Sequence, residues 1–134
     1  MKRILIIVIA GFFAASCNDN KAQEKVLLNE VIKVHEKVMA ADERLIKNKI
    51  KLDTLLNKKN FPTDTAKMLN NKLVTAENAM ESWMHSFNPE QTKKTHSEIL
   101  TYLGDQKKKI VSINLQMNAA ISQSDKYLLK AKAK

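Results

Sequence analysis

The feature that most constrains the fold is a row of mostly apolar residues, spaced alternately by four and three positions, between residues 27 and 55. This spacing keeps side chains on one side of an α-helix. The row is Leu27, Val31, Val34, Val38, Ala41, Leu45, Asn48, Leu52 and Leu55. A second row beside it widens the face, so we expect this helix to contact two partner helices, as in a bundle. It is Leu28, Ile32, His35, Met39, Ile46 and Ile50.

Two prolines divide the rest of the chain. Pro62 cannot continue a helical hydrogen-bond ladder, so the first helix should end within 57–64, and Thr63 or Asp64 can cap the second helix. The second helix carries Ala66, Leu69, Leu73, Ala76, Met80, Trp83 and Phe87 at the same alternating spacing. It is expected to be the shortest of the three.

The segment 88–91, Asn-Pro-Glu-Gln, favours the start of a third helix. Asn88 can cap it, Pro89 suits its first position, and Gln91 can complete a capping box. The core row of this helix reads His96, Ile99, Leu103, Gln106, Ile110, Ile113, Met117, Ala120, Ser124 and Tyr127. Because no strand pattern occurs, we predict an all-α fold: an elongated antiparallel three-helix bundle, up-down-up, over residues 24–134.

The N-terminus is typical of a secretory signal. Lys2 and Arg3 precede an apolar run over residues 4–15, which is too short for a mature membrane span. The run ends in small residues followed by Cys17, a pattern that resembles the lipobox of bacterial lipoproteins, with Ala14 where Leu is commoner. The resemblance implies a cleaved signal peptide over 1–16, diacylglycerol on Cys17 and a lipid-anchored tether over 17–23. The alternative is an ordinary signal peptide with an incidental cysteine.

The net charge of the chain limits the classes of partner that we expect it to bind. Without Lys2 and Arg3, 21 basic residues face 14 acidic ones, a formal charge of +7. Export argues against nucleic acid, so anionic lipid headgroups or envelope polymers are the expected partners, and a solvated lysine-rich surface is the plainer alternative. The only cysteine is the acylation candidate, and no glycine-rich phosphate loop or His-Glu-x-x-His motif occurs. We therefore expect no enzymatic activity.

Methionine and histidine gather at one predicted level of the bundle. If the helices run antiparallel and the third begins at Pro89, the side chains of five residues should converge, namely His35, Met39, Met80, Met84 and His96. Thioether and imidazole ligands together suit a soft ion such as Cu(I). The alternative is that the methionines fill gaps around Trp83 and the histidines are hydrogen-bonded helix residues.

Three aromatic residues suggest an interaction surface at the same end. Trp83, Phe87 and Tyr102, with lysines nearby, could form an apolar patch for a partner protein or a lipid surface. Trp83 also belongs to the core row of its helix, which favours burial instead.

The chain resembles the small helical lipoproteins of Bacteroidetes-type bacteria in its lipobox Cys17, its lysine-rich helical body and the motifs His35-x-x-x-Met39 and Met80-x-x-Trp83-Met84-x-x-Phe87. The resemblance implies lipid attachment to the cell envelope, which we expect to be at the outer membrane, with no established activity. The preferred hypothesis is a non-enzymatic binding or scaffold module. The alternatives are a periplasmic copper carrier and a basic holdase for exported chains, which would need exposed apolar surface. The oligomeric state stays open.

Overall fold

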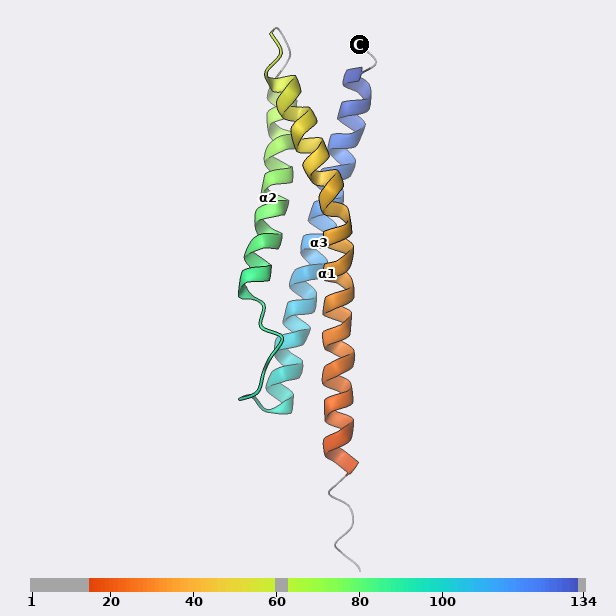
Figure 1. Ribbon diagram of the computed structural model, residues 1–134, viewed down its shortest axis with the longest axis vertical. Helices are drawn as coiled ribbons and strands as arrows, with labels where there is room; N and C mark the ends of the chain where they lie inside the picture. The colour runs from red at the N-terminus through yellow and green to blue at the C-terminus, as the bar shows by residue number, and fades with distance from the viewer. Residues whose placement is uncertain (1–14, 60–62, 133–134) are drawn as a thin grey trace, which may run out of the picture.

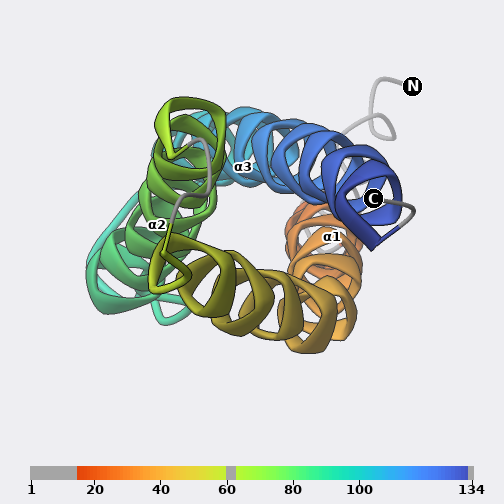
Figure 2. The same cartoon turned by 90° about the horizontal axis from the view of Figure 1, so that it is seen from above.

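The computed structural model describes residues 15–59 and 63–132, and these form three α-helices. They are α1 (Ala15–Leu56), α2 (Asp64–Ser86) and α3 (His96–Lys132). In Figure 1, α1 and α3 run in one direction and α2 runs in the opposite direction at their side, and Figure 2 shows all three around a common axis. The all-α, up-down-up bundle is confirmed, with no strand in the described residues. Most of the predicted signal peptide, residues 1–14, lies outside the described residues.

The beginning of α1 differs from the prediction. We expected a tether over residues 17–23 and a helical bundle from residue 24, but α1 begins at Ala15. Residues 18–23 contain no proline or glycine, and extending a nucleated helix costs little per residue. These residues lack apolar periodicity because the first turns of α1 extend beyond the start of α3 (Figure 1). The lack of an apolar pattern over residues 18–23 therefore reflects the lack of a partner helix at this level. The residues themselves are helical.

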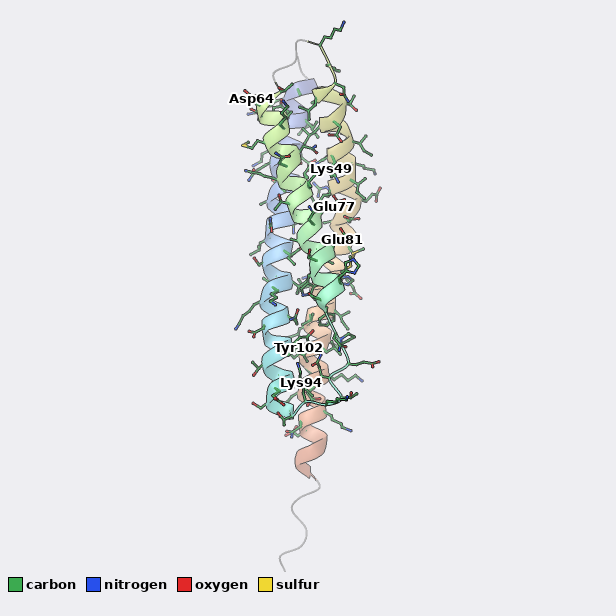
Figure 3. All side chains as sticks on the ribbon, turned by 90° about the vertical axis from the view of Figure 1, so that its left-hand side faces the viewer. Lys49, Asp64, Glu77, Glu81, Lys94 and Tyr102 are labelled. Carbon is green, nitrogen blue, oxygen red and sulfur yellow. The ribbon has the colours of Figure 1, made fainter. Side chains whose placement is uncertain are left out.

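The core follows the first apolar row closely. Val31, Val38, Leu45 and Leu52 are fully buried, and no member of the row is exposed. The second row is wrong as a core face, because four of its members are 39% to 61% exposed: Ile32, Met39, Ile46 and Ile50. Contact between α1 and both partners is nevertheless correct. Between α1 and α2, Lys49 of α1 forms an ion pair with Glu77 of α2 (Figure 3).

A buried amide sets the register between α1 and α3. Asn48 is 2% exposed, and its Nδ2 donates to Ser124 Oγ at 2.9 Å and to Asp125 Oδ1 at 2.7 Å. Arg44 in turn donates to Asp125 Oδ2 at 2.6 Å. A one-turn slip of α3 would leave the Asn48 amide without these acceptors, and an unsatisfied buried polar group is costly. A polar residue in an otherwise apolar helix seam is a known means of fixing register.

This network makes stability depend on pH. The pKa of the Asp125 carboxyl lies below its usual range: burial, the largest influence, raises it, but the hydrogen bonds from Asn48 and Arg44 and nearby cationic charge outweigh that. A lowered folded-state pKa means that the stabilisation is present above the unfolded pKa of about 3.9 and is lost as pH falls through the folded-state value. In urea unfolding between pH 7 and pH 2, we expect the free energy of unfolding of Asp125→Asn to fall less steeply with decreasing pH than that of the wild-type protein. An equal flattening in the control Asp105→Asn, on an exposed face, would contradict the assignment.

The start of α3 also differs from the prediction. The helix begins at His96, not at Pro89, and its capping box joins Thr95 and Glu98. The Thr95 N–H donates to Glu98 Oε2 at 2.8 Å, and the Glu98 N–H approaches Thr95 Oγ1 at 3.4 Å. Asn88 instead closes a turn, because its Oδ1 accepts from the Glu90 N–H at 2.9 Å. Thr-x-x-Glu at 95–98 was the stronger capping signal.

Removing this cap should weaken the bundle modestly. We expect Thr95→Ala to lower the free energy of unfolding by about 1 kcal/mol, because the helix loses an N-cap hydroxyl. The same change at Thr92, in the preceding loop, is the matched control and should cost less. Equal midpoints for the two variants in chemical denaturation would show that Thr95 is not the cap.

Candidate functional site at the N-terminal end of the bundle

Aromatic rings tie the three helices together where α2 ends. The Trp83 ring lies 5.7 Å from the His35 ring of α1 and stacks on Phe87 at 4.7 Å, measured between centroids. Phe87 stacks in turn on Tyr102 of α3 at 6.3 Å. Trp83 is only 5% exposed. Its face is therefore part of the core, and an exposed patch centred on Trp83 does not form.

Tyr102 fastens the loop at residues 87–95 to α3. Its hydroxyl oxygen accepts from the Asn88 N–H at 2.8 Å. Lys94 Nζ lies 4.6 Å from the centroid of the Tyr102 ring, a cation–π geometry, and both side chains lie at the same end of the bundle in Figure 3. Phe87 and Tyr102 are half-buried. Of the three residues predicted as an interaction surface, these two retain some accessible area.

A partly open pocket of about 670 Å³ lies beside this loop. It is formed by the first turns of α1, the loop and the first turns of α3. Its lining is Asn20, Lys21, Glu24, Lys25, Leu28, Pro89, Gln91, Thr92, Lys94, His96, Ile99 and Leu103. Lysines and polar groups therefore share the pocket with aliphatic side chains. Sequence reasoning missed this site, although Lys21 and Lys25 share one side of a helix by their i,i+4 spacing.

His96 joins the two helices across the pocket. Its Nδ1 lies 2.8 Å from Glu24 Oε1, and both side chains are about one-quarter exposed, at 27% and 24%. The contact connects the first turn of α3 to α1 near its N-terminus. The contact also engages Glu24, the one acidic side chain that lines the pocket.

This pairing shows that the predicted metal ligands do not all converge. His96 lies at the level of Glu24, whereas His35 lies at the level of Trp83. Glu24 and His35 are eleven positions apart on one helix, which corresponds to roughly 17 Å along its axis. The prediction assumed that α3 starts at Pro89 and has already climbed two turns at residue 96. Because α3 starts at His96, this side chain stays at the bottom of the bundle.

The predicted methionine ligands divide between core and surface. Met80 is 4% exposed, whereas Met39 and Met84 are 44% and 43% exposed. Within residues 15–59 and 63–132, no group of three or more histidine, cysteine or acidic side chains is close enough to hold a metal ion. Copper binding through His35 and the methionines stays a prediction, now without His96.

No protein-family model, curated protein or solved structure matches this chain. Among the described helices, none has a stretch that is both long and apolar enough to cross a bilayer. The functional argument therefore depends on this chain's own residues.

Proposed function

We propose that this protein is a non-enzymatic, lipid-anchored component of the cell envelope whose bundle acts as a rigid binding or scaffold module. The observation that carries the proposal is the continuity of α1, which runs unbroken from Ala15, past Cys17, to Leu56. At 1.5 Å per residue, the part from Cys17 onward is roughly 60 Å long. An anchor on Cys17 would hold the far end of the bundle at a defined height above the bilayer.

The interior supports a structural role for the bundle. Apolar side chains from all three helices fill the core, and the buried Asn48 amide is hydrogen-bonded. Charged side chains pair along the helix surfaces, as Arg44 does with Asp125 and Lys107 with Glu30. Such pairs join α1 to α3 at widely separated levels. We expect the anchor to lie in the outer membrane.

Attachment is tested by the mass of the N-terminus. When the full chain is expressed in a bacterium with two membranes, the membrane-extracted protein should begin at Cys17 and carry a diacylglycerol. Cys17→Ser should abolish the lipid mass and the partition into detergent, whereas the matched control Ser16→Ala keeps a small residue before the cysteine and should preserve both. An unmodified Cys17 thiol in the wild-type protein would overturn the proposal.

The exposed apolar residues of α1 favour a second candidate function. Ile32, Met39 and Ile46 recur every seven positions and are 39%, 44% and 41% exposed. A chaperone that holds exported chains would use such a surface. If this function is correct, the protein should bind an apolar-surface dye in its folded state and suppress aggregation of an unfolded client. Absence of both effects would remove this candidate.

A further inference from the structure

We propose that the pocket between α1, residues 87–95 and α3 binds an anionic phospholipid of the bilayer that holds the anchor, an inference that rests on the proposed function. The α1 residues of the pocket, Asn20 to Leu28, follow Cys17 by three to eleven positions. These separations correspond to roughly 5–17 Å along the helix. A lipid of the same leaflet is therefore within reach of the pocket.

The charge of the pocket selects an anion. Lys21, Lys25 and Lys94 line the pocket with three formal positive charges, against one formal negative charge from Glu24. Among the described residues, none of these three ammonium groups is paired with a carboxylate. Glu24 is already engaged by His96. Free cations near a membrane attract anionic headgroups and hold them electrostatically.

The aliphatic side chains of the pocket favour a ligand that carries apolar groups beside its charge. Leu103 is 2% exposed, and Leu28 and Ile99 are half-buried at the same site. A free phosphate would leave these aliphatic side chains in water, whereas the glycerol and upper acyl carbons of a phospholipid would cover them. The volume of about 670 Å³ lies within the range of ligand pockets.

The backbone at the start of α3 is not the anion site. Glu98 already caps this end through the Thr95 N–H. This bond and the hydrogen bond from the Thr95 hydroxyl keep the pKa of Glu98 below its ordinary value. The lysines therefore supply the attraction. The Nζ of Lys94 lies over the ring of Tyr102, which does not line this pocket, so the attraction depends on Lys21 and Lys25.

The test uses the membrane-extracted mature protein and short-chain lipids below their micellar concentration. Calorimetric titration with dioctanoyl phosphatidylglycerol should show one site, and binding should raise the melting temperature. Dioctanoyl phosphatidylcholine and inorganic phosphate should each bind at least about tenfold more weakly, because each supplies only part of the required chemistry. Phosphate binding as tight as phosphatidylglycerol binding would overturn the lipid assignment.

Two double variants locate the binding. Lys21→Gln with Lys25→Gln removes two pocket cations and should weaken phosphatidylglycerol binding at least about tenfold. Lys33→Gln with Lys37→Gln makes the same charge change at the same spacing on exposed positions of α1 and should leave binding unchanged. Equal losses in both variants, or no binding by the wild type, would overturn the site.

The titration is independent of the anchor, because a dissolved lipid can reach the pocket whether or not Cys17 is acylated. Binding without acylation would leave the pocket assignment standing and overturn the proposed function. Acylation of Cys17 without lipid binding would leave the proposed function standing and overturn the pocket assignment.

Discussion

Replacing Trp83 with alanine is expected to lower the free energy of unfolding by about 3–5 kcal/mol, the range for large aromatic side chains removed from a core. Trp83 is 5% exposed and contacts the His35 ring of α1 and the Phe87 ring at the end of α2. Truncation would open a cavity beside Phe87 and His35, at the point where α2 ends. Chemical denaturation monitored by circular dichroism measures the loss.

A matched control separates core packing from a docking role. Met84, the next residue along α2, is 43% exposed, and Met84→Ala should change stability by no more than about 0.5 kcal/mol. Trp83→Phe should cost less than Trp83→Ala, because a phenylalanine keeps a ring in the stack. If Trp83→Ala barely changed stability, Trp83 would be an interaction anchor and its burial in the core would be refuted.

Replacing Asn48 with aspartate should be comparably damaging, although the two side chains have nearly the same shape. The Nδ2 atom now donates to Asp125 Oδ1 at 2.7 Å, so the change sets a second carboxylate oxygen against the first. The substitution loses two hydrogen bonds and buries an unpaired charge. We expect a loss of about 3–5 kcal/mol at pH 7.

The pH dependence of this variant gives an independent check. Burial and the neighbouring Asp125 charge should raise the folded-state pKa of the introduced carboxyl. The loss of stability relative to the wild-type protein is then largest at neutral pH, and it shrinks as the pH falls through that raised pKa. Asn78→Asp makes the same change on an exposed position of α2 and should be nearly neutral. Matching unfolding curves for the two variants would mean that Asn48 does not set the helix register.

The helices could be predicted from the sequence where two elements pack against each other. The row from Leu27 to Leu55 was correct because burial against α2 and α3 imposes its spacing. Residues 17–23 were misjudged because a helix without a partner leaves no apolar pattern. Residues 88–95 were misjudged because two capping signals stand seven positions apart, and Thr95 with Glu98 forms the cap.

The candidate site depended on that second error. A helix beginning at Pro89 would raise His96 toward His35 and assemble a methionine and histidine cluster. With the helix beginning at His96, the same side chain meets Glu24, and the loop closes one wall of a basic pocket. Contacts that depend on where a loop ends are not encoded in helical periodicity, so neither the pocket nor the pairing of His96 could be predicted from it.

The most direct test of the account is amide hydrogen exchange over residues 21–24 in the mature, lipid-bearing protein. These are the first amides with an acceptor four positions back in a chain that begins at Cys17. A continuous α1 predicts that they exchange at least about tenfold more slowly than in an unfolded chain, though faster than those around the buried Val31. Such protection would mean that the anchor and the bundle are joined by one helix. Unprotected exchange at 21–24, with protection intact from Val31 onward, would show a flexible tether and contradict the rigid module.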